Sequence, residues 1–547
     1  MTMPKPVPIV PVKKSAWKEF ALFLVFLAVV ALVLVARVRL LSIPFERDEG
    51  EYAYIAQQFL KGVMPFAETH NMKMPGIYFV YAGCMALFGR DLEGIHIGLL
   101  VANLASVLLV ALLARIVISK SAGYVAGSVF AVLSLSETVL GVYAHAEHFV
   151  MLCVIPGLLL LYLGCSKKRW ILAAIGSVLL GSSFCILQHG AFFVAFGALF
   201  AAVHAWNGGG TPRWLRALKA GSIVVGFAAV PVAVLFLTMY LSGVFGDFWY
   251  WTFTYARKYV TMRGLGYGAE TFRIAVVPMA ISMALPWVAG CFGLVCLLRA
   301  KSGVRPKLFV VGFGIASLIA ITPGLYFRDH YFVLLLPAVS LLCAAGMDVI
   351  FAFVMNHSSR FTALKLAGVL AVVALWPILV ERTNLYATPT TTLSNTKFYP
   401  NAFAESIVIG RFIEENSRAA DRIAVVGSEP QIYFYAHRKA ATSFMYTYPL
   451  MELHPNAAKQ QQQMISEIET AKPKFLLLVR NPLSWLSVGA SDTRIFYWFH
   501  EYSLAHYAIV GCADRVSRDS TNYVFGAQCQ IYRPQSQYGI DVYQRVN

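Results

Sequence analysis

FALFLVFLAVVALVLVA, residues 20–36, is an uninterrupted apolar run near the beginning of the sequence. About 20 such residues are enough to cross the hydrocarbon core of a bilayer as a helix. Three lysines, Lys13, Lys14 and Lys18, precede the run. It is longer than the apolar region of a typical secretory signal, and no small-residue cleavage site follows it. We therefore expect it to remain as the first membrane-spanning helix.

The same apolar character continues through residues 20–380, as long runs separated by short polar turns. Of the 547 residues, 58% are hydrophobic and only 13% are charged, whereas a soluble protein carries about 25% charged residues. Residues 381–547 return to the composition of a soluble domain. The sequence thus predicts a polytopic α-helical membrane protein, with a transmembrane module at 1–380 and a soluble α/β domain at 381–547.

The apolar runs predict eleven spans, with ends uncertain by several residues. Two of them, 170–187 and 191–206, are short and separated only by Gln188, His189 and Gly190, so a re-entrant hairpin is an alternative there. The full set of expected spans is 18–40, 94–117, 121–140, 149–165, 170–187, 191–206, 220–242, 274–298, 308–323, 331–354 and 362–380.

The net charge of +17 is explained by basic residues in the short loops, rather than by nucleic-acid binding. The turns at 141–148 and 188–190 contain no lysine or arginine. This asymmetry predicts a cytoplasmic N-terminus and, after eleven crossings, a periplasmic C-terminal domain in a bacterial inner membrane; Arg37 and Arg39 run against it, and one miscounted span would change the side. The basic residues of the expected inner loops are Arg115, Lys120, Lys167, Lys168, Arg169, Arg213, Arg216, Lys219, Arg299, Lys301, Arg305 and Lys307.

The soluble domain is expected to be an α/β sandwich. Arg422–Val426 and Lys474–Val479 have the pattern of buried strands, and 507–510 and 522–532 suggest further ones. Helical patterns at 402–416 and 456–471 precede the first two strands. The domain also contains Cys512 and Cys529, which could form a disulfide outside the cytoplasm; sequence alone leaves this open.

Two outer loops are long, the first at 41–93 and the second at 243–273. In the first loop, residues 49–60 have apolar residues at helical spacing and 76–88 form an apolar stretch too short to span. We expect both to be amphipathic helices at the membrane surface, the alternative being simple loop cover.

The residues that can carry chemistry all fall on the outer side. Ionisable residues at a membrane face are functional candidates, although a solvated helix start, an interfacial lysine or a polar rim are ordinary alternatives. His145-Ala146-Glu147-His148 lacks the spacing of a strong zinc motif, so we expect no metal. Carboxylates, phosphate-binding cations and aromatics together indicate an enzyme that acts on a phosphorylated lipid. The clusters are 47–52, His70–Gly76, 145–148, 326–331, and Arg257, Lys258 and Arg263 among aromatic residues.

The segment RDEGEYAYIAQQFLKGVMPFAETHNMKMPGIYFVYA (47–82) resembles the first external loop of GT-C glycosyltransferases. It is most similar to the bacterial branch (family 39) related to protein O-mannosyltransferases and to the lipid A aminoarabinose transferase. The branch motifs Asp-Glu-x-x-Tyr-Ala and Lys-Pro-Pro-x-x-Tyr are matched at 48–53 and 73–78, with Met74 in place of the first proline.

The resemblance extends over about residues 15–380. HAEHF (145–149) is similar to the family's Asn-Ala-Glu, with His145 in place of the asparagine. FRDHYFVLLLPAVSLLCAAG (327–346) is similar to its His-Tyr-x-x-x-x-x-Pro span, and QHG (188–190) also resembles the family. The soluble domain resembles the variable periplasmic domains of these enzymes only loosely.

The resemblance implies an inverting hexosyl- or pentosyltransferase that takes a sugar from a polyprenyl phosphate at the periplasmic face, with no cofactor and no nucleic-acid partner. Asp48 would be the base for the acceptor hydroxyl, with Glu49 beside it. Cations would stabilise the leaving phosphate. The expected carrier-binding residues are Lys73, Arg257, Lys258, Arg263, Arg328, His330 and Tyr331, and the expected sugar- or acceptor-orienting residues are Glu147, His145, His148 and Gln188.

Neither the sugar nor the acceptor follows from the sequence: lipopolysaccharide, a surface glycan, a lipid and a protein all remain open. Two alternative functions also remain. One is a glycan polymerase or ligase that uses a pyrophosphate carrier, which would place its large loop and arginines elsewhere. The other is a transporter or flippase for a lipid-linked sugar, which would have charged residues in mid-span and often internal repeats.

Overall fold

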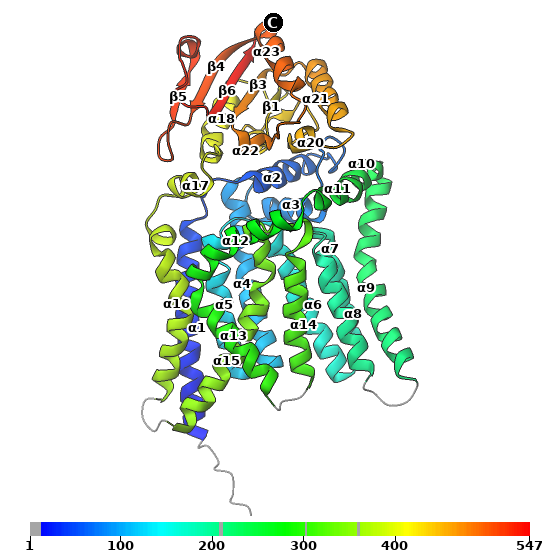
Figure 1. Ribbon diagram of the computed structural model, residues 1–547, viewed down its shortest axis with the longest axis vertical. Helices are drawn as coiled ribbons and strands as arrows, with labels where there is room; N and C mark the ends of the chain where they lie inside the picture. The colour runs from blue at the N-terminus through cyan, green and yellow to red at the C-terminus, as the bar shows by residue number, and fades with distance from the viewer. Residues whose placement is uncertain (1–11, 207–211, 301–303, 358–361, 547) are drawn as a thin grey trace, which may run out of the picture.

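The computed structural model describes residues 12–206, 212–300, 304–357 and 362–546. Figure 1 shows a bundle of long helices, a mixed α/β region at one end of it, and a layer of short helices between the two. The C-terminus lies at the far end of the α/β region. Lys301, expected in an inner loop, lies outside the described residues.

The chain is a multi-pass integral membrane protein. In the described part of the chain, six helices are long and apolar enough to cross a membrane, or seven if one bent pair is a single span. The six are α1 (Val12–Arg39), α4 (Leu92–Val117), α6 (Ala146–Lys167), α9 (Arg213–Leu241), α15 (Leu336–His357) and α16 (Thr362–Tyr386).

The other expected spans also contain helices, but shorter or broken ones. The range 274–298 is not one straight span: it is made of α12 and α13, which are bent by 97° at Met283. The range 121–140 contains only a short helix followed by a 3-10 turn. These helices are α5 (Lys120–Leu133), η1 (Glu137–Val139), α7 (Trp170–Ile186), α8 (Gly190–Trp206), α12 (Leu265–Ser282), α13 (Ala284–Arg299), α14 (Val304–Ala320), η3 (Pro323–Leu325) and η4 (Asp329–Leu334).

Small residues let the spans approach closely. A Cβ at Gly293 of α13 would lie 1.8 Å from the carbonyl oxygen of Leu342 in α15. A Cβ at Gly181 of α7 would lie 2.0 Å from the carbonyl oxygen of Ala228 in α9. In a bilayer, helices associate through this kind of backbone packing rather than through the hydrophobic effect. These contacts fix the bundle whose outer end carries the short helices.

The first loop forms α2 (Arg47–Phe59) and α3 (Gly76–Phe88), as the helical pattern predicted. Its position differs from expectation, however. α2 is buried on nearly all of its faces, because the C-terminal region covers it (Figure 1). The contact is tight: a Cβ at Gly50 would lie 2.4 Å from the Cβ of Gln431. α2 is therefore an element between two parts of the protein and does not lie exposed on the membrane surface.

The second loop continues from α9 and forms a short helical arm beside α2 and α3. It consists of α10 (Phe245–Trp249), a π-helical turn η2 (Tyr250–Tyr255) and α11 (Ala256–Thr261). The π-helical turn shifts the register of the side chains, so that Trp251 and Tyr255 are buried while Trp249 is 45% exposed. Such π-bulges are frequent at functional sites.

The C-terminal region contains a six-stranded mixed sheet of order β2-β1-β3-β6-β4-β5. β1, β2 and β3 are parallel, and β6 joins them to β4 and β5 in antiparallel register. The mixed α/β architecture is thus as predicted. The strands are β1 (Arg422–Val426), β2 (Lys439–Ala440), β3 (Phe475–Arg480), β4 (Tyr507–Asp514), β5 (Asn522–Phe525) and β6 (Gly539–Arg545).

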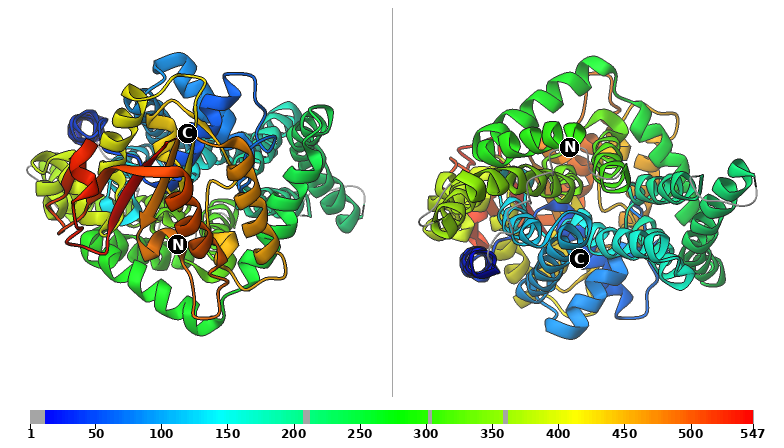
Figure 2. Two further views of the ribbon diagram at one scale, coloured as in Figure 1. Left: turned by 90° about the horizontal axis from the view of Figure 1, so that it is seen from above. Right: turned by 90° about the horizontal axis from the view of Figure 1, so that it is seen from below.

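Helices cover this sheet and connect it to the bundle. Two of them, α18, which precedes β1, and α21, which precedes β3, were expected. Figure 2 shows the sheet and its helices seated over the middle of the bundle when the molecule is viewed from above. The helices are α17 (Thr390–Phe398), α18 (Phe403–Glu415), α19 (Gln431–Tyr435), α20 (Tyr448–Met451), α21 (Ala457–Ala471), α22 (Pro482–Trp485), α23 (Arg494–His506) and η5 (Gly526–Gln530).

The two cysteines of this region do not form a disulfide in the structure. The Cys512 thiol donates to an Asp541 carboxylate oxygen at 3.3 Å, and the Cys529 thiol donates to the Val524 carbonyl at 3.0 Å. Each thiol has its own partner because Cys512 lies in the sheet and Cys529 lies on η5, beyond the end of β5. The expected strand at 522–532 also ends earlier, at Phe525.

Candidate active site

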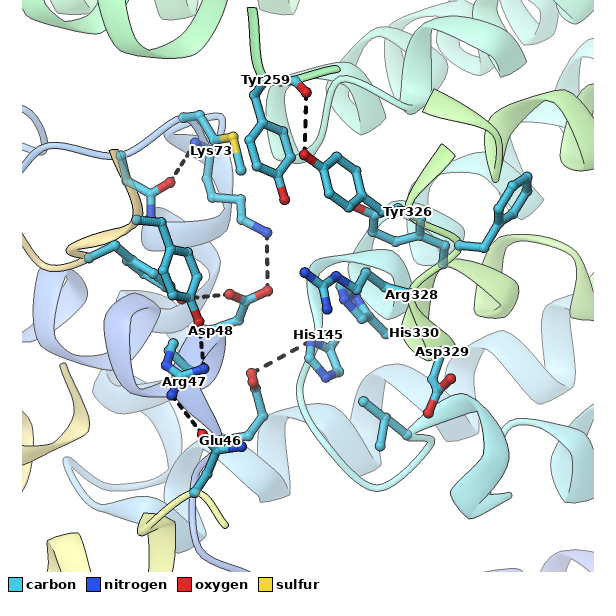
Figure 3. A pocket seen from close by; sticks show the side chains of 18 of the residues that line it. Glu46, Arg47, Asp48, Lys73, His145, Tyr259, Tyr326, Arg328, Asp329 and His330 are labelled. Carbon is cyan, nitrogen blue, oxygen red and sulfur yellow. Dashed lines mark hydrogen bonds and ion pairs between the residues drawn. The ribbon is translucent and has the colours of Figure 1, made fainter. Parts of the chain in front are cut away.

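A cavity of about 390 Å³ lies where the first loop, the second loop, the adjacent ends of the spans and the C-terminal region meet (Figure 3). One side is formed by acidic and basic residues of the first loop. The opposite side is formed by the turn between α14 and α15, and aromatic residues of the second loop close one end. The lining includes Glu46, Asp48, Lys73, His145, Tyr326, Arg328, His330 and Tyr446.

Local sequence fixes the start of α2 at the cavity wall. The Glu46 side chain accepts a hydrogen bond from the backbone N–H of Glu49 at 2.9 Å, and the Glu49 side chain accepts one from the backbone N–H of Glu46 at 3.3 Å. This reciprocal capping box satisfies two backbone donors that a helix start leaves free. It directs the first turn of α2, and with it Asp48, into the cavity.

Asp48 has a partner on each carboxylate oxygen. Lys73 Nζ lies 3.1 Å from Oδ2, and the Tyr446 hydroxyl donates to Oδ1 at 2.6 Å. Burial alone would raise the pKa of Asp48, but Lys73, His330 and His145 hold that pKa well below its ordinary value. Burial alone would lower the pKa of Lys73, yet Asp48 raises it above its usual range. The two groups therefore stand in the cavity as a carboxylate and an ammonium.

Glu46 is a second carboxyl on the same wall, and sequence reasoning did not single it out. Its Oε1 lies 3.8 Å from His145 Nδ1. Burial raises the pKa of Glu46 well above its ordinary value, and the neighbouring carboxylates of Asp48 and Glu49 add to the rise. The pKa of Asp48 is thus lowered, while that of Glu46, two residues away, is raised. Such opposite shifts favour the charged form of one carboxyl group and the protonated form of the other. The capping spacing Glu-x-x-Glu was the signal that could have identified it.

Arg328 faces Asp48 and Lys73 across the cavity (Figure 3). It lies in the turn between α14 and η4, where Leu325 and Phe327 have positive φ angles of 55° and 42°. Its guanidinium stacks on the Tyr326 ring at 5.6 Å. Among the residues that the structure describes, no carboxylate forms an ion pair with it, and the adjacent Asp329 pairs instead with Lys397 at 3.0 Å. Arg328 is therefore a cation with unused capacity for an anion.

Two stacked histidines form the floor of the cavity. The His145 and His330 rings lie 4.0 Å apart, and His330 Nδ1 is 3.2 Å from Glu147 Oε2. His145 is only 1% exposed, and neither of its ring nitrogens has a hydrogen-bond partner within the described ranges. A buried polar group without a partner is costly, so these nitrogens are available to a bound molecule.

Three of these residues have the donor set of a metal site. The ligand atoms of Asp48, His145 and His330 all lie within 4.8 Å of one another, and a carboxylate with two imidazoles can hold a divalent transition metal. Lys73 already places a positive charge 3.1 Å from Asp48. A metal ion at this place would have to compete with that ammonium for Asp48.

The structure brings together Asp48, Lys73, His145, Arg328, His330 and Tyr331 of the residues expected from the sequence. Other expected residues do not line the cavity. Glu49 is committed to Glu46, His96 and the Ala144 N–H, and Glu147 reaches the site only through His330. Arg263 does not line the cavity itself but lies over the rings of Tyr267 and of Tyr326, which does. The others contact the protein elsewhere or are exposed: His148 contacts Asn103, Gln188 donates to the Met72 and Thr252 carbonyls, and Arg257 and Lys258 are exposed.

The C-terminal region also supplies lining residues, including two tyrosines for which the sequence favours ordinary strand-end packing over a binding face. Tyr446, Tyr448 and Asn401 line the cavity, although they lie some 350 residues or more after Arg47 in the chain. The aromatic wall comes from the second loop, through Trp251 and Tyr255. The sequence places aromatic residues of this loop beside the cations of the expected site.

No protein-family model matches the sequence, and a search of curated proteins gives no match. Solved structures do match in fold. The crystal structure of ArnT from Cupriavidus metallidurans in the apo state has a TM-score of 0.62 and 13% sequence identity, covering 95% of this chain and 97% of that chain. ArnT bound to undecaprenyl phosphate has a TM-score of 0.62 and 12% sequence identity. The archaeal oligosaccharyltransferase AglB from Archaeoglobus fulgidus was solved in complex with an inhibitory peptide and a dolichol-phosphate. It has a TM-score of 0.53 and 12% sequence identity, covering 94% of this chain and 75% of that chain.

Identities this low show the fold alone. The fold is that of a polytopic helical membrane protein with a C-terminal mixed α/β region, similar to GT-C membrane glycosyltransferases. The predicted fold class is thereby confirmed, and the resemblance in the first loop is supported at the level of structure. What the chain does remains a question for the chemistry of the site.

Proposed function

We propose that this protein is a membrane glycosyltransferase that moves a sugar from a polyprenyl phosphate to an acceptor hydroxyl, at the outer face of a bacterial inner membrane. One observation carries the proposal: the Asp48–Lys73 pair faces Arg328, a cation without an acidic partner among the described residues, across one cavity. A base and two cations are the groups that such a transfer needs.

The cavity lining includes exposed apolar surface on a helix of the bundle, which suits a lipid-linked donor. Ile274 on α12 lines the cavity and is 60% exposed. The fold relatives are consistent with such a donor, since ArnT was solved with undecaprenyl phosphate and AglB with a dolichol-phosphate. The assignment of the cavity and of the 381–547 domain to the periplasmic side rests on the distribution of basic loop residues.

In the proposed reaction the acceptor oxygen forms a bond to the anomeric carbon of the donor sugar. The bond between that carbon and the phosphate oxygen breaks, and the lipid phosphate leaves with the electron pair. The proton of the acceptor hydroxyl passes to Asp48. Attack from the face opposite the phosphate inverts the anomeric configuration. Lys73 and Arg328 stabilise the negative charge that develops on the leaving phosphate.

Lys73 connects the two halves of this reaction. While Lys73 neutralises Asp48, the carboxylate is a weak base, as its lowered pKa indicates. A phosphate bound between Lys73 and Arg328 would draw the ammonium toward itself and so raise the basicity of Asp48. Donor binding would thus activate the base. His145, whose ring nitrogens have no hydrogen-bond partner within the described ranges, is placed to contact a sugar hydroxyl.

The test is label transfer by purified protein in detergent, from a radiolabelled polyprenyl-phosphate sugar to an envelope extract. The extract offers lipopolysaccharide, glycan, lipid and protein acceptors together, and fractionation of the product identifies the acceptor class. Wild type should transfer label, and Asp48→Asn should lower the rate on the order of 10³-fold or more. Wild-type rates in Asp48→Asn would remove Asp48 from the mechanism, while no transfer by folded wild type would contradict the function.

A further inference from the structure

The segment 441–447 of the C-terminal region, between β2 and α20, closes the cavity from above. It is anchored in its own region at both ends. Glu467 accepts hydrogen bonds from the Thr442 hydroxyl and the Ser443 N–H, each at 2.8 Å. At the other end the Thr447 hydroxyl donates to the Ser484 carbonyl at 2.9 Å. Since these contacts are internal to the C-terminal region, they fix the shape of the segment independently of the first loop.

This closing segment contacts the first loop at two points. The His70 N–H donates to the Ser443 carbonyl at 2.8 Å, and the Ser443 hydroxyl lies 3.1 Å from His70 Nδ1. The second point is the Tyr446 hydroxyl, which donates to Asp48 Oδ1 at 2.6 Å. The first contact sets the register between the two segments, and the second reaches the carboxylate on which the proposed chemistry depends.

The C-terminal region as a whole is held firmly against the first loop. Arg47 forms a buried ion pair with Glu429 at 2.7 Å and donates to the Asn401 side chain at 2.9 Å. The Phe45 N–H donates to the Tyr435 hydroxyl at 3.0 Å. Separating the partners of a buried ion pair leaves an uncompensated buried charge, which is strongly destabilising. This interface therefore strongly favours a single arrangement. Tyr446 therefore approaches Asp48 from a rigid support.

The Tyr446 contact leaves the two oxygens of Asp48 with different surroundings. Oδ1 is occupied by a short charge-assisted hydrogen bond from a hydroxyl, and Oδ2 faces Lys73 at 3.1 Å. Burial raises the pKa of Tyr446 well above its ordinary value, and Asp48 adds to this rise, so the hydroxyl keeps its proton and acts as a donor. With Oδ1 held, the plane of the carboxylate is fixed.

We propose that the C-terminal region completes the active site through Tyr446, a positioning residue that holds Asp48 by Oδ1 so that Oδ2, beside Lys73, is the oxygen that serves the acceptor. This inference rests on the proposed function. A misplacement of about 1 Å of a reacting group costs about 10²-fold in rate. Loss of the hydroxyl should therefore slow the chemical step and leave donor binding, which depends on Lys73 and Arg328, unchanged.

The experiment compares wild type, Tyr446→Phe and Tyr435→Phe as full-length proteins in the same detergent. Tyr435→Phe is the matched control, because it also removes one buried hydroxyl at the same interface, but its partner is the Phe45 N–H rather than Asp48. Label transfer from the polyprenyl-phosphate sugar gives kcat and the donor KM, and thermal unfolding reports the fold. Tyr446→Phe should lower kcat by about 10- to 100-fold with the donor KM within about twofold of wild type. Tyr435→Phe should keep the wild-type kcat.

A double-mutant cycle separates positioning from a general loss of structure. In an Asp48→Asn background Tyr446→Phe should not reduce the residual rate further, because the residue acts through Asp48. An equal loss of kcat in Tyr446→Phe and Tyr435→Phe would overturn the proposal. So would a loss of rate from Tyr446→Phe in the Asp48→Asn background as large as its loss in wild type. Wild-type kcat in Tyr446→Phe would overturn it while leaving the proposed function intact. A wild type that transfers no label would contradict the function itself, and with it the role of Tyr446.

Discussion

The first and second loops both carry charged and aromatic residues into the same layer of the protein, but they direct different ones inward. The first loop directs its charged residues inward, where Asp48 and Lys73 form an ion pair at the cavity wall. The second loop directs its aromatic residues inward, through Trp251 and Tyr255, and leaves Arg257 and Lys258 exposed. Two loops that both mix charged and aromatic residues thus give a charged wall and an aromatic wall.

The difference follows from the cost of burying a charge. A lysine or aspartate can be buried only beside a partner, and the fold brings Lys73 to Asp48 across 25 residues of chain. The second loop has no such partner for Arg257 or Lys258, so their charges stay outside while aromatic rings, which bury readily, face inward. A basic residue near a membrane is therefore a site candidate only when the fold also supplies a partner.

The largest difference is expected between substitutions of one lysine in each loop, Lys73 and Lys258. Lys73→Ala should lower sugar transfer roughly 10³-fold, because it removes the cation shared by Asp48 and the leaving phosphate. Lys258→Ala, the matched change in the second loop, should stay within about twofold of wild type, since exposed substitutions of this kind have small effects. Initial rates of label transfer at saturating donor measure both, and similar losses in the two variants would break the distinction between the loops.

A smaller difference is expected between substitutions of two arginines, Arg328 at the cavity and Arg257 in the second loop. Arg328→Ala should lower transfer about 10²-fold and raise the donor KM, because this guanidinium binds the phosphate in both the ground state and the transition state. Arg257→Ala should leave both constants near wild type. Donor titrations of the two variants make the comparison, and a raised KM in Arg257→Ala alone would place the phosphate at the second loop instead.

A pH-dependent effect on stability is expected at Glu46. The pKa of Glu46 is raised in the folded protein, so the folded state holds this proton more tightly than the unfolded state. The resulting contribution to the free energy of unfolding is complete below the ordinary carboxyl pKa and is lost as pH rises through the raised pKa. Glu46→Gln does not titrate and keeps an oxygen that can cap α2. Between about pH 5 and about pH 8, Tm of wild type should therefore fall by about 2 °C relative to Glu46→Gln. A constant Tm difference across that range would show that Glu46 is ionised in the fold.

The smallest effect is expected from metal removal. Because Lys73 already supplies the positive charge beside Asp48, treatment with EDTA followed by gel filtration should leave the transfer rate unchanged. Readdition of Mn²⁺ or Zn²⁺ should not raise it. A loss on chelation that one of these ions restores would assign Asp48, His145 and His330 to a metal instead.

The spans and much of the sheet could be predicted because their signal is local. An apolar run of span length defines its own helix, and Arg422–Val426 and Phe475–Arg480 are short apolar strands. β6, Gly539–Arg545, was missed because its sequence alternates polar and apolar residues only weakly and gains its place from pairing with β3 and β4. The bend between α12 and α13 likewise depends on tertiary packing.

The site was predictable only where a motif lay within one loop. Asp48, Lys73, Arg328 and His330 each stood in a short polar cluster at a membrane face, and the structure brings all four to the cavity. Tyr446 could not be found in this way, because its contact with Asp48 joins residues 398 positions apart. Nor does a loop sequence show which of its charges face inward, as Glu49 illustrates: it lies next to Asp48 but is committed to His96 and backbone groups.

The most direct test of the central claim is a comparison of donors with wild-type protein. One radiolabelled sugar is supplied on a polyprenyl phosphate and, separately, on a polyprenyl pyrophosphate, with the same envelope extract. A site built from Asp48, Lys73 and Arg328 as proposed should transfer label from the monophosphate donor, release unlabelled polyprenyl phosphate in equal amount, and invert the anomeric centre. Transfer from the pyrophosphate donor alone, or movement of the labelled lipid across a bilayer without any covalent product, would contradict the account.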